Sequence, residues 1–328
     1  MQRLALGLLL ASLLCASCTR SSSSPRQDNH VLLVPDWKNH VVHRIALDGS
    51  YEGDFLDPLR AQNPSLNRTL WAQPLAILMV DGAPASFWLA ADRALSEWGP
   101  GGEYLRTVLD DTAYLEVPTC MVTTGDRIFV ASADKRDMLV FSRDGSRAGS
   151  FGHPGFYRAN DCEIGPDGSI YVASTLPNAA TPGVISIWDP ANTAESAQPI
   201  GYRVPGDLGE DGTHWAHSLA FDEDGNLLIT EFARGRLERW NLERNERIEI
   251  LLDSDQPGAY LKLERGPDGV VYMAGPAGVY RFDSRATAAD LKNLEPFFDA
   301  RQLAGRYTEP FSPAGIAVVP RAALGAAR

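Results

Sequence analysis

A short run of β-forming residues recurs six times along the chain, each time followed by a turn and a second apolar run. The first runs are residues 31–34, 87–90, 128–131, 170–173, 227–230 and 271–274. The units open at Pro74, Pro118, Asn160, His217, Leu261 and Pro313, with spacings of 44, 42, 57, 44 and 52 residues. A period of about 45 residues with three or four short strands is typical of a β-propeller. Six units therefore predict an all-β fold with six blades.

The two ends of the repeat complement each other. Residues 313–319 form an opening strand with no partner strands after it, whereas residues 31–47 form later strands with no opening strand before them. Combining the two ends in one blade closes the ring and leaves no free strand edge there. The sequence therefore predicts a six-bladed β-propeller that is closed by pairing of its N- and C-terminal strands.

Composition and charge exclude several classes of protein. The chain is 44% hydrophobic and carries 30 Lys and Arg against 42 Asp and Glu, a net charge of −12 with no basic run. Phosphate binding needs clustered basic residues, so we expect no nucleic-acid partner. The sequence also has no Gly-x-Ser-x-Gly elbow, phosphate-binding glycine loop or His-Glu-x-x-His motif.

The first residues have the pattern of an export signal. Residues 4–14 are nearly all Leu, Ala and Gly, which is shorter than the ~20 residues that cross a bilayer but suits a signal peptide. The stretch from Cys15 to Cys18 resembles the signal of bacterial lipoproteins, which implies lipidation of Cys18. Cys15 stands where that signal usually has Leu, which leaves ordinary secretion as the alternative.

These features divide the chain into four parts. They are a lipoprotein signal peptide (1–17), a flexible Ser-rich tether (18–29), the propeller (30–320) and a C-terminal tail (321–328). Thr19 replaces the Asp that commonly retains lipoproteins at the inner membrane. We therefore expect an exported protein at the outer membrane or facing the periplasm, held to the membrane by its lipid alone.

Two stretches carry a resemblance to a known repeat. Residues 34–45, which end shortly before Asp48-Gly49, resemble an NHL repeat, and residues 218–230 resemble the opening half of the same repeat. The resemblance implies a propeller scaffold. Propellers of this kind serve as enzymes, binding proteins and assembly platforms, so the fold alone does not choose a function.

The segments that enter the first strand of each blade should converge on one mouth of the central channel. Each of them contains at least one aromatic residue, and the candidates for the wall of the mouth are Trp71, Tyr114, Tyr157, Trp215, Tyr260 and Phe311. Their polar residues are Glu116, Arg158, Asn160, Asp161, His214, His217, Lys262 and Glu309. An apolar wall with a few polar groups is typical of a ligand pocket. The alternative is that the aromatic residues fill gaps between the blades.

Residues 160–168 resemble the stretch of the regucalcin/gluconolactonase family in which an Asn-Asp pair opens a strand. The resemblance implies that Asn160 ligates a divalent metal such as Ca. A hard cation needs several oxygen ligands. The corresponding openings in other blades offer Thr119, His217 and Leu261, which do not complete that family's set.

Residues 215–220 resemble a blade opening of the peptidyl-hydroxyglycine amidating lyases, which implies that His217 ligates Zn. Asp161 and His214 are the candidate partners for a mixed site. In this enzyme interpretation His217 or Asp161 holds the metal, and Tyr157 or Arg158 stabilises a developing anion.

Cys120 and Cys162 each lie two residues after the opening of neighbouring blades, so they should sit at similar heights beside the channel. An exported protein can form a disulfide between them. The alternatives are a soft-metal pair with His217, or two small buried thiols.

Three classes of function remain open. The first is an exported, lipid-anchored propeller that binds a small molecule, a peptide or an envelope protein at its mouth. The second is a metal-assisted lyase or lactonase with its site at the same mouth. The third is an assembly platform that works through the blade faces.

Overall fold

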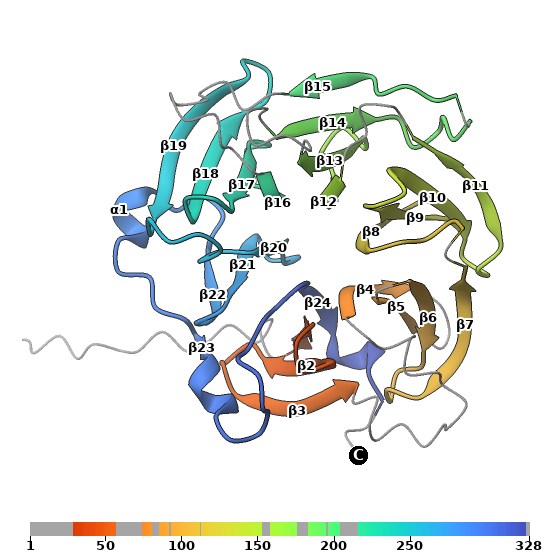
Figure 1. Ribbon diagram of the computed structural model, residues 1–328. Coiled ribbons are helices and arrows are strands. Elements are labelled where there is room, and N and C mark those ends of the chain that lie inside the picture. Colours follow the sequence, from red (N-terminus) through yellow and green to blue (C-terminus); the bar gives the residue numbers. More distant parts are fainter. Residues whose placement is uncertain are drawn as a thin grey trace, which may run out of the picture.

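The computed structural model describes residues 29–56, 74–80, 85–91, 93–111, 113–152, 158–175, 183–194, 196–203 and 216–325. These residues form six four-stranded antiparallel sheets that stand as blades around a central channel (Figure 1). The prediction of an all-β, six-bladed propeller is confirmed. No helix in the described ranges is long and apolar enough to span a membrane.

Each blade begins at the channel and ends at the rim. In blade 1 the order is β24 (Ala317–Pro320), β1 (His30–Asp36), β2 (Val41–Ala46) and β3 (Tyr51–Leu56). Blade 2 contains β4 (Pro74–Val80), β5 (Ser86–Ala91), β6 (Ala94–Trp98) and β7 (Tyr104–Asp110). Blade 3 contains β8 (Pro118–Thr124), β9 (Arg127–Ser132), β10 (Asp137–Ser142) and β11 (Arg147–Phe151).

The other three blades repeat this pattern. Blade 4 contains β12 (Arg158–Ile164), β13 (Ile170–Thr175), β14 (Val184–Trp188) and β15 (Gly201–Arg203). Blade 5 contains β16 (Ala216–Phe221), β17 (Leu227–Glu231), β18 (Arg236–Asn241) and β19 (Glu246–Asp253). Blade 6 contains β20 (Lys262–Arg265), β21 (Val270–Gly275), β22 (Gly278–Asp283) and β23 (Phe298–Asp299), with short helices α1 (Ala288–Leu291) and η3 (Ala300–Leu303) beside it. A last 3₁₀ turn, η4 (Arg321–Ala323), follows β24.

The hydrophobic core lies between neighbouring blades. Successive side chains of a strand point to opposite faces of its sheet, and each face of a blade packs on the next blade. Between blades 3 and 4, for example, Phe129 and Phe151 pack with Trp188, and the Phe151 and Trp188 ring centroids are 4.9 Å apart. Burial on both faces explains why the second strand of each blade is a continuous apolar run.

Three of the turns share the sequence Asp-Gly-Ser. In each turn the Asp carboxylate accepts a hydrogen bond from the Ser backbone N–H, and the Gly has a positive φ. These turns are residues 48–50, 144–146 and 167–169. An Asp side chain that bonds two residues ahead stabilises a tight turn, and Gly adopts a positive φ without steric cost. The recurring Asp-Gly pairs in the sequence therefore mark strand ends.

Strand β24 closes the ring by pairing with β1. The register runs antiparallel from His30 opposite Pro320 to Leu33 opposite Ala317. Beyond it, the Ala314 N–H donates to the Pro35 carbonyl at 2.9 Å. The two ends of the repeat therefore meet in blade 1, as the sequence predicts.

A buried ion triplet joins the other strands of blade 1. His43 on β2 is fully buried, and its Nε2 lies 3.2 Å from Asp36 Oδ2 at the end of β1. Its Nδ1 lies 3.6 Å from Asp54 Oδ1 on β3. Burial alone would lower the pKa of His43, but the two carboxylates outweigh burial and raise this pKa above its ordinary value. We call Asp36, His43 and Asp54 the closure triplet.

The returning C-terminal segment binds the closure triplet. Tyr307 donates a hydrogen bond to Asp54, which lies 253 positions earlier. The Ser312 N–H donates to Asp36 Oδ1 at 3.3 Å, across 276 positions. Burial alone would raise the pKa of Asp54, but hydrogen bonds from His43 and Tyr307 lower it to about 2. The buried charges thus tie the two ends of the repeat together.

We expect His43→Gln to lower the free energy of unfolding by about 3–5 kcal/mol near pH 6, because it leaves two carboxylates without their cation. The raised pKa of His43 stabilises the fold fully below its unfolded value of about 6.5, and this contribution is lost as the pH rises through the folded value. The lowered pKa values of Asp36 and Asp54 stabilise the fold above about pH 3.9, and this contribution is lost as the pH falls through their folded values. Urea unfolding across the pH range measures both effects.

His30→Gln, at the start of β1 and outside the triplet, is the control. Above about pH 6.5 the free energy of unfolding should fall with rising pH in the parent and in His30→Gln. It should fall less steeply in His43→Gln. Equal slopes in all three proteins would contradict a buried, charged His43.

Candidate functional site

A cavity of about 970 Å³ lies at the end of the channel where the inner strands begin. We call it the mouth cavity. Strand openings from all six blades line it: Leu75, Thr119, Asn160, His217, Leu261 with Lys262, and Pro313 with Ala314. Turns between second and third strands add Trp37, Asp134, Arg136, Phe232 and Pro276. The cavity is therefore built from residues far apart in the sequence, which meet because the ring is closed.

The aromatic residues of the entering segments do not line this cavity where the structure describes them. Trp71, Tyr157 and Trp215 lie outside the described residues. Phe311 is buried between blades 6 and 1, with its ring centroid 5.6 Å from that of His43. Tyr260 packs edge-on against Tyr280 with centroids 5.9 Å apart. Tyr114 is 42% exposed and lies 3.9 Å below the Arg147 guanidinium.

The physical reason is the path of the chain. Each entering segment runs from the outermost strand of one blade to the innermost strand of the next, so its side chains meet the blades before they reach the channel. Tyr260 and Phe311 therefore pack between blades, which is the alternative that the sequence left open, whereas Tyr114 lies partly exposed beneath Arg147. None of these three residues is among those that line the mouth cavity.

Two aromatic residues that the sequence analysis did not single out line the mouth cavity instead. Trp37 follows the first apolar run of blade 1 by three residues, and Phe232 follows that of blade 5 by two. Both lie in turns between second and third strands. An aromatic residue directly after the repeated apolar run was the signal that could have identified them.

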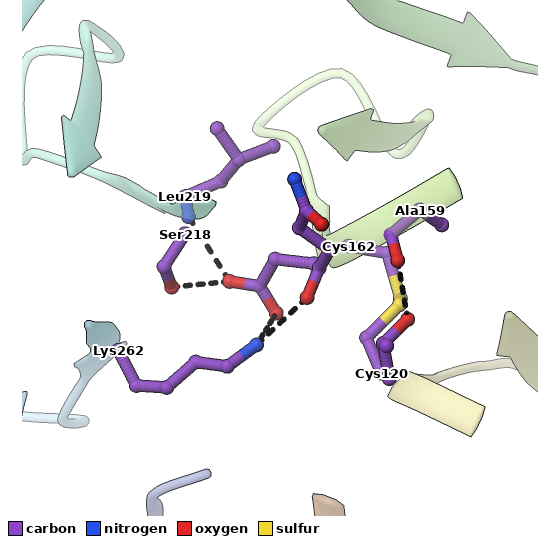
Figure 2. The surroundings of a disulfide bond; sticks show 9 residues. Cys120, Ala159, Cys162, Ser218, Leu219 and Lys262 are labelled. Carbon is purple, nitrogen blue, oxygen red and sulfur yellow. Dashed lines mark hydrogen bonds and ion pairs between the residues drawn. A yellow bond between two sulfur atoms is a disulfide. The ribbon is translucent and has the colours of Figure 1, made fainter. Parts of the chain in front are cut away.

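Lys262 and Asp161 form a buried ion pair at the floor of the cavity (Figure 2). The Lys262 Nζ lies 3.3 Å from Asp161 Oδ1 and donates to the Asn160 carbonyl at 2.8 Å. The other carboxylate oxygen of Asp161 accepts hydrogen bonds from the Ser218 hydroxyl and from the Leu219 N–H at 3.0 Å. Blades 4, 5 and 6 are thus held together by one carboxylate.

His217 has a fixed tautomer. Its Nδ1 lies 2.7 Å from the Leu261 carbonyl, which can only accept, so Nδ1 carries the proton. The ring stacks on Phe232 with centroids 5.5 Å apart. Burial, aided by the Lys262 charge, lowers the pKa of His217 to about 4. His217 is therefore neutral at physiological pH, and its Nε2 is a hydrogen-bond acceptor.

The donor set does not fit a divalent metal. Both oxygens of Asp161 are engaged, and the Lys262 ammonium stands beside them as the counter-cation. The Asn160 amide donates to the Ala216 carbonyl at 3.0 Å. No group of three or more His, Cys, Asp or Glu residues in the described ranges could hold a metal ion. Of the other candidate ligands, His214 lies outside the described residues.

Arg158, the remaining candidate catalytic residue, lies at the rim of the cavity. Its Nε is 3.5 Å from Asp134 Oδ1, and its side chain is 59% exposed. It does not contact the ion pair at the floor in the described residues. The described residues of the mouth can therefore bind a ligand through charge and hydrogen bonds.

Below the floor the channel narrows to a cavity of about 260 Å³ that contains two further carboxyl groups, Glu163 and Glu264. Burial, reinforced by the Asp161 charge, raises the pKa of Glu163 to about 8. Burial and the neighbouring carboxylates also raise the pKa of Glu264 well above its ordinary value.

A disulfide joins Cys120 on β8 to Cys162 on β12 beside this channel (Figure 2). Their Cα atoms are 5.7 Å apart, within the limit of about 7 Å for a disulfide. The inner strands of blades 3 and 4 come this close because they converge on the axis. The Thr119 hydroxyl adds a hydrogen bond to the Ala159 carbonyl at 2.8 Å, so two links join these strands.

The fold and this cavity define a six-bladed β-propeller with an open, partly polar mouth. No protein-family model matches the chain, and no curated protein matches it. Among solved structures, a protein of unknown function from Bacteroides caccae is similar over 89% of this chain and 99% of its own, with a TM-score of 0.60 and 13% identity. A chain from a nidogen/laminin complex is similar over the same shares, with a TM-score of 0.62 and 15% identity. These similarities show the fold.

We expect Asp161→Asn to lower the free energy of unfolding by about 3 kcal/mol, because the buried Lys262 ammonium loses its counter-charge. The double variant Asp161→Asn/Lys262→Met should regain most of that loss, since it removes both charges. Chemical denaturation of the two single variants and the double variant measures the coupling between the residues.

Glu116→Gln is the matched control, because Glu116 pairs with Lys135 at 3.4 Å near the surface. This change should cost less than about 1 kcal/mol. Strictly additive effects of the Asp161 and Lys262 substitutions would show that the two charges do not interact.

Proposed function

We propose that this protein is a binding protein that takes a small organic ligand into the mouth cavity. The observation that carries the proposal is the cavity itself, whose volume of about 970 Å³ is in the range of small-molecule sites. Its walls are mostly apolar, with Trp37, Phe232, Leu75 and several prolines, and a few polar groups stand among them. This composition is typical of sites in which apolar surface gives affinity and polar groups give orientation.

Binding is favoured over metal-assisted lyase or lactonase chemistry by the hydrogen bonds at the floor. Asp161 and Asn160, the residues that the enzyme interpretation would use as ligands, hold neighbouring blades together. A metal would have to displace Lys262 from Asp161. A peptide or an envelope protein remains the other class of partner, and a neighbour of the same fold comes from a nidogen/laminin complex.

The proposed location is the bacterial cell envelope. The support is the pattern of residues 1–18, in which Cys18 follows an apolar segment and two small residues. A lipid on Cys18 and the Ser-rich tether would hold the propeller near a membrane while leaving the mouth accessible.

We expect Ala314→Phe to abolish ligand binding, because the larger side chain enters the cavity at its wall. The measurement is a thermal-shift screen of a small-molecule library, followed by calorimetry of each hit with the parent and the variant. Hits that stabilise both proteins equally would contradict binding in the mouth cavity.

The control is Ala148→Phe on the exposed rim strand β11, which should leave every hit unaffected. Pro276→Trp, at an exposed position in the β21–β22 turn of the neighbouring blade 6, provides a second obstruction of the same cavity.

Lipid attachment is tested separately. Expression in a bacterium fed radiolabelled palmitate should label the parent protein and not the Cys18→Ser variant. Incorporation of the label into Cys18→Ser, or none into the parent, would contradict the proposed anchor.

A further inference from the structure

The charges around the mouth cavity differ in sign from those of the whole chain. Three cationic residues line the cavity in the described part of the chain, Arg136, Arg158 and Lys262, against two carboxylates, Asp134 at the wall and Asp161, which pairs with Lys262 at the floor. The chain as a whole has a net charge of −12. An excess of one charge in a cleft with low-dielectric walls attracts ligands of the opposite sign. The described residues of the mouth thus carry a small excess of positive charge in an acidic protein.

Two of these cations have capacity left for a ligand. Lys262 has three N–H donors, and its contacts in the described residues, to Asn160 and Asp161, account for two. Arg158 is paired with Asp134 at 3.5 Å, but both side chains are well exposed. An exposed ion pair contributes little, so an incoming anion can compete for Arg158.

His217 supplies the complementary group. Its Nδ1–H is held by the Leu261 carbonyl, and its Nε2 has no partner among the described residues. As the ring is neutral, this nitrogen accepts a hydrogen bond from a hydroxyl or amide on a ligand. The ring cannot turn easily, because it stacks on Phe232.

From this arrangement we infer that the ligand is a hydroxycarboxylic acid with an apolar body, an inference that rests on the proposed binding role of the mouth. The carboxylate binds the cationic side chains, and the hydroxyl donates to His217 Nε2. The apolar body packs against the wall that includes Trp37 and Leu75. His217 then determines specificity for the hydroxyl, whereas Lys262 and Arg158 determine specificity for the anion.

Three matched probes test the inference on the full chain: mandelate, phenylacetate, which lacks the hydroxyl, and mandelamide, which lacks the charge. Mandelate should bind about ten-fold more tightly than either of the other two, because each loses one hydrogen bond or ion pair. Mandelate binding should also weaken as salt concentration rises. Ligand-observed NMR titration measures the three dissociation constants.

Variants assign the roles. His217→Phe keeps the ring stack, and the Leu261 carbonyl still accepts from Thr230 at 3.2 Å. The His217→Phe variant should bind mandelate and phenylacetate with equal affinity, and it should bind both more tightly than mandelamide. Arg158→Gln should weaken both acids several-fold and leave mandelamide unchanged, whereas Arg301→Gln, which removes an exposed charge elsewhere, should change nothing.

Mandelamide binding as tightly as mandelate, or no binding of mandelate at millimolar concentration, overturns the inference. The three probes are compared on the parent protein, so this result does not depend on whether any variant folds. If neutral ligands bind and are blocked by Ala314→Phe, the proposed function stands and this inference alone fails. If no ligand is blocked by that substitution, the proposed function fails as well.

Discussion

Pairing of β24 with β1 is the interaction on which the other contacts of the ring depend. Each blade buries both faces against its neighbours, so a ring that opened at blade 1 would expose two apolar sheet faces to water. The backbone ladder between these strands is short, with four residue pairs. The closure triplet and Tyr307 extend the contact outward from the channel toward the rim, with charge-assisted hydrogen bonds that neutral side chains would not provide.

The mouth cavity follows from that closure. Asp161 on β12, Ser218 on β16 and Lys262 on β20 come from three consecutive blades, and 101 residues separate the first from the last. Their contacts need the inner strands to be fixed at the same height around the axis. The cavity floor is therefore a second set of links between blades, and the groups that would recognise a ligand are positioned by the same bonds that stabilise the ring.

The fold could be predicted from the sequence because repeated local signals specify it. Apolar runs at a regular spacing and Asp-Gly turns define strands, and the unmatched segments at the two ends define the closure. The site could be predicted only in part. The strand openings at Asn160 and His217 do reach the mouth cavity, because the position of a residue along its blade fixes its height on the channel.

Side-chain direction at the mouth could not be predicted in the same way. Phe311 and Tyr260 lie in entering segments, but they turn into the spaces between blades, and the direction depends on which neighbouring side chains leave room. The buried pairing of His43 was also invisible in the sequence. Its partners Asp36 and Asp54 are nearby in the chain, but charged residues in short strands are usually solvated, and contacts from the distant Tyr307 and Ser312 complete their surroundings.

The order of strands in blade 1 has a mechanical consequence. The chain enters the propeller at His30, the first residue of β1, and β1 is hydrogen-bonded on both sides, to β24 and to β2. A pulling force at this point loads two ladders in shear along the strand, rather than peeling off an edge strand one bond at a time. A propeller held through its N-terminal segment would therefore need a higher force to unfold than one whose first strand lay at the rim.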